Sequence, residues 1–396
     1  MTYDTLHAYY RDQAVLPTHG RFQTEADLTA HALRRRQIFS GKLQLPPRLF
    51  KGAHLLEFGP DSGENSLVFA RWGAECTLFE PNLKAHPVIV DYFERYRLTS
   101  HLVKLEAADV AALARREGVQ PEYDFVVAEG FIYTVRPERM WIDLFARLLR
   151  EQGLAVINYC ETFGSWMELL TKVAHARVRS LTGWPALETA QKLFTAKWNT
   201  IPHMRAFESW VMDVLENPFV RLRYLLEPGA LCRQMEAAGL RLYSSWPPYR
   251  NGLDVYWHKR TPDVEEEARS REAFLARSRV SHIFGKALFL RSPAPEAQLL
   301  ELVRLTDGLI DEFSTAAAEQ VLEGLRALEQ LVRTEVVYAE AGEHASAVSA
   351  VRSFAELMSV LKRGELEAII RFCSHDAAFL RTWGMPYHFA VFAREA

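Results

Sequence analysis

The stretch of residues 54–82 constrains the fold more than any other part of the chain. It opens with a short apolar run whose length and composition suit a strand buried on both faces. Gly59 ends that run, a polar turn with a second glycine follows, and residues 66–72 have the pattern of a helix that packs on a sheet. A second apolar run at 76–79 ends on Glu80. This order of strand, turn, helix and strand predicts an α/β domain.

The turn and the acid that follows it suit a nucleoside. Gly59 and Gly63 allow a positive φ and close approach of the backbone, and the first turn of a helix offers N–H groups without intrahelical partners. Glu80 lies about twenty residues past Gly59, the distance at which nucleoside-binding α/β folds place a carboxylate for the ribose hydroxyls. Asp61 replaces the middle glycine of the dinucleotide fingerprint, and its charge would repel the pyrophosphate of NAD or FAD. A cationic nucleoside would be attracted instead.

This stretch resembles the first motif of class I S-adenosylmethionine-dependent methyltransferases, which reads as an acidic residue, any residue and then Gly-x-Gly-x-Gly. Glu57, Gly59 and Gly63 match that motif, and Asp61 departs from it. The resemblance implies a Rossmann-like sheet that is mostly parallel with its last strand antiparallel. It also implies S-adenosylmethionine as the cofactor, with Glu57 near the methionyl ammonium and Glu80 on the ribose. The cofactor-binding residues that we expect are Glu57, Gly59, Pro60, Asp61, Gly63, Asn65, Glu80, Asn82, Asp109 and Glu129.

Further candidates follow the later predicted strands. Asp109 comes after the third strand, where the resemblance implies a contact with the adenine amino group; a cap on the next helix is the alternative. The fourth strand, at 123–128, is followed by Glu129 and Tyr133. Because open α/β sheets bind ligands beyond the carboxyl ends of their strands, we expect these two side chains in the same crevice as the first turn.

A hydroxyl or amine that accepts a methyl group must lose a proton, and a carboxylate, imidazole or phenol within hydrogen-bond reach can take it. The sulfonium donor is already activated, so positioning supplies much of the remaining effect. No histidine–carboxylate pair with recognisable spacing selects one base or indicates a metal site. The catalytic candidates, in order of preference, are Glu129, Tyr133, Glu161 and His203. A structural role is the alternative for each, above all for the lone His203.

The pattern of elements suggests three regions. Residues 1–50 form a helical segment that could close over the site as a lid. Residues 51–260 form the methyltransferase domain, with an aromatic helical insert at 163–228 and a closing strand at 253–258. Residues 261–396 are rich in Ala, Leu and Glu and form a helical C-terminal region. The lid candidates are Tyr9, Tyr10, His19 and Arg21, with packing on the edge of the sheet as the alternative.

Composition limits the classes of partner that we expect for this chain. The net charge of −3 over 396 residues gives no reason to expect nucleic acid. No window reaches eighteen uninterrupted apolar residues and the first residues do not read as a secretion signal, so we expect a cytoplasmic protein without a membrane partner. The four cysteines suggest neither disulfides nor zinc.

Three classes of function stay open. The favoured one is a methyltransferase acting on a small molecule such as a sugar or secondary metabolite. An NAD-linked or sugar-nucleotide enzyme on a similar fold is the second. A catalytically silent member that binds the cofactor, or nothing, and acts as a subunit through its helical C-terminal region is the third. The partners that we expect are a small-molecule acceptor and, through the C-terminal region, a second copy of the chain in a homo-oligomer.

Overall fold

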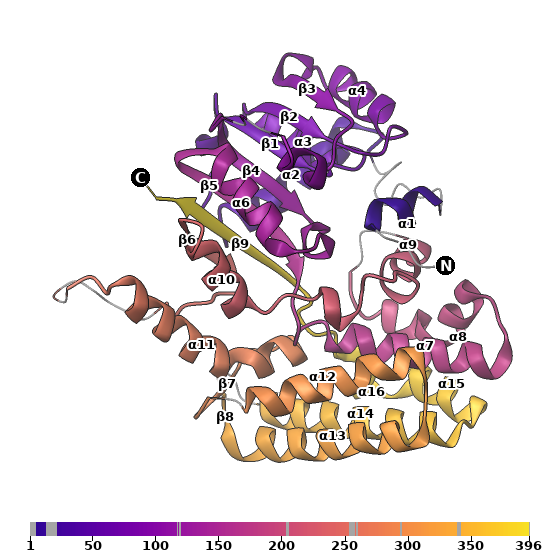
Figure 1. The fold of residues 1–396 in the computed structure, drawn as a ribbon. Coiled ribbons are helices and arrows are strands. Elements are labelled where there is room, and N and C mark those ends of the chain that lie inside the picture. The colour runs from indigo at the N-terminus through magenta and orange to yellow at the C-terminus, as the bar shows by residue number, and fades with distance from the viewer. Residues whose placement is uncertain are drawn as a thin grey trace. The chain divides into compact units, whose positions relative to one another are not determined.

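The protein is described here by a computed structural model, which divides into two compact units (Figure 1). The sheet unit comprises Met1–Tyr159, Pro228–Tyr249 and His388–Ala396, and the helical unit comprises Cys160–Glu227 and Arg250–Tyr387. The structure describes residues 5–12, 22–116, 118, 120–202, 206–252, 258, 260–293, 295–338 and 342–395.

The sheet unit contains a seven-stranded sheet with the order β3-β2-β1-β4-β5-β9-β6. β1 pairs in parallel with β2 and β4, and β3 and β5 extend the sheet in parallel on either side. β9 runs antiparallel to β6. The strands are β1 (His54–Phe58), β2 (Glu75–Phe79), β3 (Leu102–Glu106), β4 (Tyr123–Glu129), β5 (Leu149–Cys160), β6 (Leu240–Trp246) and β9 (Tyr387–Arg394). This confirms the predicted Rossmann-like sheet, mostly parallel with its last strand antiparallel.

The antiparallel strand comes from a different part of the chain than expected. β9 lies at 387–394 and takes the place beside β6 that we assigned to 253–258. Of that predicted strand, residues 253–257 lie outside the described residues. The C-terminal region that we predicted at 261–396 includes residues 388–396, which the structure groups with the sheet unit. β9 reads Tyr-His-Phe-Ala-Val-Phe-Ala-Arg, an apolar run that can fill an inner position of a sheet.

Helices flank this sheet, and α2 opens with a capping box. The Thr24 hydroxyl accepts a hydrogen bond from the Asp27 N–H at 3.2 Å, and the Asp27 carboxylate accepts one from the Thr24 N–H at 2.8 Å. This capping box satisfies two of the N–H groups that the helix leaves without partners. The helices of the unit are α1 (Leu6–Asp12), α2 (Glu25–Phe39), α3 (Glu64–Arg71), α4 (His86–Arg95), α5 (Val110–Ala114), α6 (Glu138–Leu148) and α10 (Pro228–Glu236).

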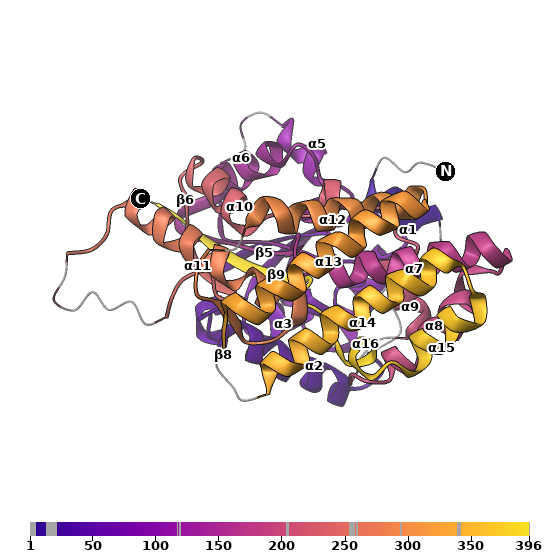
Figure 2. The same cartoon turned by 90° about the horizontal axis from the view of Figure 1, so that it is seen from below.

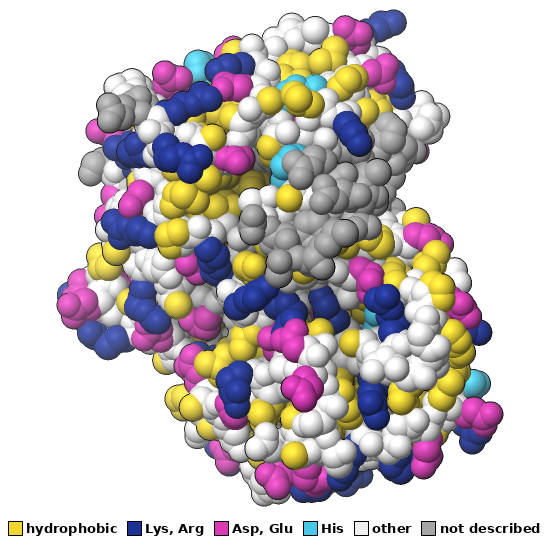
Figure 3. Space-filling model, turned by 45° about the vertical axis from the view of Figure 1, so that its right-hand side comes forward, with side chains coloured by type: hydrophobic (Ala, Val, Ile, Leu, Met, Phe, Trp, Pro, Cys, Tyr) yellow, Lys and Arg dark blue, Asp and Glu magenta, His cyan; other side chains and the backbone are white. Residues whose placement is uncertain are grey.

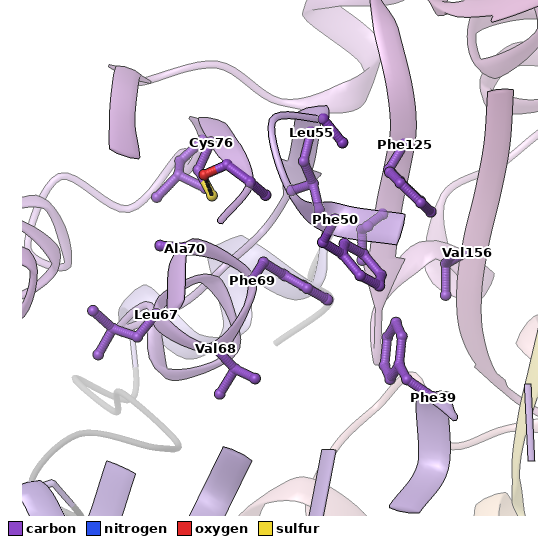
Figure 4. Close-up of a cluster of buried hydrophobic side chains, with 14 of the residues drawn as sticks. Phe39, Phe50, Leu55, Leu67, Val68, Phe69, Ala70, Cys76, Phe125 and Val156 are labelled. Carbon is purple, nitrogen blue, oxygen red and sulfur yellow. Dashed lines mark hydrogen bonds between the residues drawn. The ribbon is translucent and has the colours of Figure 1, made fainter. Parts of the chain in front are cut away.

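An aromatic core fastens α2 to the sheet. Phe50, in the turn before β1, stacks on Phe69 of α3 and on Phe125 of β4, with ring centroids 5.4 and 4.4 Å apart (Figure 4). Phe39, the last residue of α2, meets Phe50 and Phe69 edge-on. Removing one such buried ring costs about 3–5 kcal/mol. The C-terminal end of α2 is thereby held beside α3, whose N-terminus begins at the glycine turn.

The helical unit combines the two stretches that we predicted as a separate insert and a separate C-terminal region. α7 and α12 are joined by a hydrogen bond from the Trp166 indole N–H to Thr306 Oγ1 at 2.9 Å. α12, α13 and α14 lie side by side (Figures 1 and 2). Its elements are α7 (Trp166–Thr182), α8 (Ala186–Trp198), α9 (Phe207–Trp210), α11 (Val264–Phe284), α12 (Glu296–Asp311), α13 (Thr315–Glu335), α14 (Glu343–Arg363), α15 (Leu366–His375), α16 (Ala377–Arg381) and the strands β7 (Leu288–Leu290) and β8 (Val336–Tyr338).

Two general properties of the molecule bear on its partners. Among the described helices, none combines the length and apolarity needed to cross a bilayer. On the face drawn in Figure 3, acidic and basic side chains are interspersed. This mixture agrees with the net charge of −3.

Candidate functional site

The turn between β1 and α3 depends on its two glycines. Gly59 has φ +59° and Gly63 has φ +88°, so both adopt a conformation that side chains disfavour. A Cβ at Gly59 would lie 2.9 Å from Phe131 Cε1, and one at Gly63 would lie 3.1 Å from Ile89 Cγ1. Asp61 also has a positive φ, +53°, which Asp tolerates better than most residues. The backbone of this turn is therefore free of Cβ atoms at the two points where glycine was expected.

Glu57 lies in β1, just before the turn, and its side chain is buried. Its carboxyl group accepts a hydrogen bond from the Ser66 hydroxyl of α3 at 2.5 Å. The pKa of Glu57 is raised to about 8, mainly by burial and also by the nearby charge of Glu129, whereas Ser66 and Arg35 act in the opposite direction. At neutral pH this acid is mostly protonated, which is unusual for a glutamate.

Glu80, at the end of β2, is joined directly to the same turn. Its carboxylate accepts hydrogen bonds from the Asp61 N–H at 2.9 Å and from the Asn82 N–H at 2.7 Å. Burial raises the pKa of Glu80 to about 7, against the lowering effect of the Asn82 hydrogen bond. The structure thus brings Glu80 and the glycine turn together, as the spacing predicts.

Glu129, at the end of β4, is paired with a residue that the sequence analysis missed. Arg35 of α2 donates two hydrogen bonds to the two Glu129 carboxylate oxygens, at 2.6 and 2.5 Å. The guanidinium also lies over the rings of Phe39 and Phe69, 4.5 and 5.1 Å from their centroids. A planar guanidinium suits both the two-pronged pairing and the stacking. The available signal was periodicity, because Arg35 shares the buried face of α2 with Leu28 and Phe39.

The other predicted cofactor residues of the sheet unit have local partners. Asn65 Oδ1 lies 3.0 Å from His31 Nε2 of α2. Asn82 Oδ1 accepts from the Lys84 N–H at 3.1 Å, and the Pro60 carbonyl accepts from the N–H of Gly63 at 2.9 Å. These contacts order the loops around the turn. Whether the same residues touch the cofactor stays a prediction.

Asp109 is exposed and caps α5, where its carboxylate accepts from the Ala112 N–H at 2.6 Å. The cap was the alternative to an adenine contact, and the adenine contact stays a prediction. Tyr133 is buried in the short turn after β4. Of the lid candidates, Tyr9 is buried and Tyr10 half-buried in α1. His19 and Arg21 lie outside the described residues.

Glu161 and His203 are the other two catalytic candidates. Glu161 belongs to the helical unit and is fully buried there. Its Oε2 accepts a hydrogen bond from the Gly164 N–H at 2.6 Å and lies 3.6 Å from His282 Nδ1. These contacts give Glu161 a place in the packing of that unit. His203 lies outside the described residues.

The described cluster fits a cationic nucleoside. Three carboxyl groups lie at the ends of the neighbouring strands β1, β2 and β4, and a single guanidinium, that of Arg35, is paired with one of them. Glu80 is a buried acceptor fixed beside the turn, as ribose hydroxyls require. The glycines keep Cβ atoms away from the backbone that a nucleoside would approach.

Solved structures with a similar fold include methyltransferases. A putative sarcosine dimethylglycine methyltransferase from Galdieria sulphuraria has 11% identity and a TM-score of 0.37, with 98% of this chain and 97% of that chain covered. The [4+2]-cyclase SpnF has 12% identity and a TM-score of 0.36, with coverage of 92% and 80%. The N-methyltransferase NodS from Bradyrhizobium japonicum WM9, in complex with S-adenosyl-L-homocysteine, has 14% identity and a TM-score of 0.29, with coverage of 39% and 74%. No curated protein matches the chain.

A family model assigns the chain more firmly than these distant likenesses. The model described as "Methyltransferase domain" matches residues 30–245, which include α2 from residue 30 onward, the glycine turn, β1 to β5 and all of β6 except its last residue. That range is more than half of the chain. The protein therefore belongs to this family: it is a class I S-adenosylmethionine-dependent methyltransferase, and S-adenosylmethionine is its cofactor.

Proposed function

We propose that the protein transfers a methyl group from S-adenosylmethionine to a hydroxyl or amine of a small molecule, such as a sugar or a secondary metabolite. The observation that carries the cofactor half of this proposal is Glu80, a buried carboxylate fixed by two N–H groups beside the glycine turn. The choice of a small acceptor is supported by the net charge of −3 and by the interspersed acidic and basic side chains on the face drawn in Figure 3.

In this proposal the residues of the sheet unit divide the work. When bound, S-adenosylmethionine supplies an electrophilic methyl group. Glu80 accepts hydrogen bonds from the ribose hydroxyls, and its two backbone donors keep the carboxylate oriented for that task. Glu57 is the acid placed for the cationic amine.

Glu129 differs from the other two acids because Arg35 holds both of its oxygens. A carboxylate bound in this way has a fixed orientation, and it is a weaker base than a free carboxylate. We assign it the binding of the acceptor's N–H or O–H group. Bringing the acceptor and the methyl donor together in a fixed orientation supplies a large part of the rate enhancement.

Calorimetric titration of the full chain with S-adenosylmethionine, S-adenosyl-L-homocysteine and NAD tests the cofactor. We expect the first two to bind and NAD not to bind; tight binding of NAD alone would favour the oxidoreductase alternative. Incubation with labelled methyl donor and a panel of sugars, phenols and amines then tests the acceptor. Binding without transfer to any of them would favour a silent subunit.

Substitution of the first glycine tests the assigned turn. We expect Gly59→Asp to weaken S-adenosylmethionine binding by more than about a hundredfold, because its Cβ would meet Phe131 at 2.9 Å and the added charge would enter the turn. Gly52→Asp is the matched control, since Gly52 has a similar φ of +71° but nothing within 4 Å of its Cβ position. Equal affinities of the two variants would contradict the assigned site.

A further inference from the structure

Glu57 is a buried acid without an ion-pair partner among the described residues. It is 2% exposed, and its hydrogen-bond partner is the Ser66 hydroxyl. Among the residues that the structure describes, Glu57 forms no ion pair. An ionised carboxylate in such a place is costly unless it is paired.

The guanidinium of Arg35 is already paired with Glu129. Arg35 directs two of its N–H donors to Glu129, and the rings of Phe39 and Phe69 hold its guanidinium in that orientation. Moving the guanidinium to Glu57 would break a buried pair, which typically costs 3–5 kcal/mol. Arg35 therefore lowers the charge of the site at Glu129 and leaves Glu57 without a counter-ion.

The two acids near Glu57 favour its protonated form. Glu129 on β4 and Glu80 after β2 are both acids, and each raises the pKa of Glu57 in addition to the main effect of burial. On β2 the neighbouring titratable group is Cys76, whose thiol pKa is raised above its ordinary value by burial and by Glu57. On α3 the neighbour is Ser66, which does not titrate in this range. Before a ligand binds, burial and the two neighbouring acids thus favour the neutral form of Glu57, whereas Ser66 and Arg35 oppose it.

We propose that Glu57 senses the charge of the ligand: it gives up its proton to the solvent when a nucleoside that carries a cationic amine binds, so that cofactor affinity rises with pH. The O–H bond of the carboxyl group breaks, the proton passes to water or buffer, and the carboxylate pairs with the ligand's cation. This inference rests on the proposed cofactor site and deepens it, because it names the regulation of that site by pH.

The direction and the size of the pH dependence of cofactor affinity follow from proton linkage. The pKa of Glu57 is about 8 without ligand, so the acid is about nine-tenths protonated at pH 7. If the complex requires the carboxylate, about one proton leaves per ligand at pH 7. Affinity then rises by up to about fiftyfold between pH 6 and pH 8 and levels off above pH 8.

Glu80 provides the internal comparison. It is also buried and its pKa is about 7, but it accepts two backbone N–H groups and is placed for hydroxyls. It can therefore release part of a proton with any nucleoside that has a ribose. Only the release that depends on the ligand's cation reports on Glu57.

The experiment compares S-adenosylmethionine with 5′-methylthioadenosine, which has the same nucleoside but no cationic amine. Each is titrated calorimetrically into the full chain at pH 7 in phosphate and in Tris, whose ionisation heats differ, so the slope gives the number of protons released. We expect S-adenosylmethionine to release about one proton more than methylthioadenosine. We expect Glu57→Gln to abolish this difference and Glu80→Gln to preserve it.

The outcomes separate this inference from the proposed function. Equal proton release by the two ligands, or a difference that persists in Glu57→Gln, would overturn the role of Glu57 while leaving the cofactor site in place. If neither nucleoside binds to the wild-type chain, the proposed site itself fails. Thermal unfolding of Glu57→Gln at pH 6, where the native acid is already neutral, checks that the variant folds; S-adenosylmethionine affinity measured at the same pH should differ least from wild type.

Discussion

Burial shifts the pKa of two acids in one unit and of two lysines in the other. In the sheet unit it raises the pKa of Glu57 to about 8 and that of Glu80 to about 7. In the helical unit it lowers the pKa of both Lys172 and Lys197 to about 7. Desolvation acts against the charged form in all four cases.

The partners of these groups differ more than their charges do. Lys197 Nζ donates to the carbonyl oxygens of Phe379, at 2.6 Å, and Thr382, and Lys172 Nζ donates to those of Asn217 and Val220. These lysines tie loop carbonyls to helices, which is a structural use. Glu57 has one hydroxyl partner and no cation among the described residues. A buried charge whose hydrogen bonds are satisfied within the chain serves the fold, whereas one that lacks a counter-ion is available to a ligand.

The largest expected effect concerns Glu129, an acid of the sheet unit whose counter-ion, Arg35, is itself buried. Arg35→Met leaves Glu129, whose side chain is 10% exposed, without its partner and should lower the free energy of unfolding by about 3–5 kcal/mol. The double variant Arg35→Met/Glu129→Leu removes both charges and should recover most of that loss. Urea unfolding at pH 7 measures both. If single and double variants are equally unstable, the pair does not behave as an ion pair and the contrast with Glu57 disappears.

A second prediction concerns the dependence of stability on pH, which should have opposite signs in the two units. The raised pKa of Glu57 gives a contribution that is fully present below pH 4.5 and is lost as the pH rises to about 8, an upper bound of about 3–5 kcal/mol. Glu57→Gln should remove this loss and so gain stability, relative to wild type, between pH 5 and pH 8. The lowered pKa of Lys197 makes its contribution increase from pH 7 toward 10.5, and Lys197→Met should lack that increase. Urea unfolding of wild type and of each variant at pH 5, 7, 8 and 9.5 gives the change of each residue's contribution to stability with pH. Changes of the same sign for Glu57 and Lys197 would refute the comparison of the two units.

The smallest effects are expected from two buried hydroxyls. Ser66→Ala removes the hydrogen bond that lowers the pKa of Glu57, so the pH at which S-adenosylmethionine binding levels off should move upward, with a loss of stability of only about 1 kcal/mol. Thr306→Val leaves the Trp166 indole N–H without its acceptor and should cost about 1–3 kcal/mol with no effect on that pH. Calorimetry across pH and urea unfolding distinguish the two, and a pH shift in Thr306→Val would run against the assignment.

The predictable part of the sheet was the part encoded locally. The first strand, the glycine turn and Glu80 follow one another within thirty residues, so spacing alone placed them together. The partner of β6 could not be found in this way. Residues 253–258 and 387–394 are both short apolar runs, and an apolar pattern does not say which strand lies beside which.

The sequence pointed to the acids of the candidate site but not to its cation, Arg35. Arg35 stands in a run of three arginines, which reads as a solvated face of a helix. Only its pairing with Glu129, 94 positions away in the chain, explains why it is buried. Glu161 shows another limit of the sequence, because it follows a strand of the sheet but the boundary between the units falls directly before Cys160. A rule about strand ends cannot detect where a chain leaves one unit for another.

The position of β9 has a consequence for how the protein is made. The chain passes from one unit to the other after Tyr159, Glu227, Tyr249 and Tyr387, so neither unit is continuous. On the ribosome, β6 must wait while about 140 further residues are synthesised before the strand that lies beside it emerges. Until then the sheet has an exposed edge in the nascent chain, and early folding of the intervening helices would shorten the search for the missing strand.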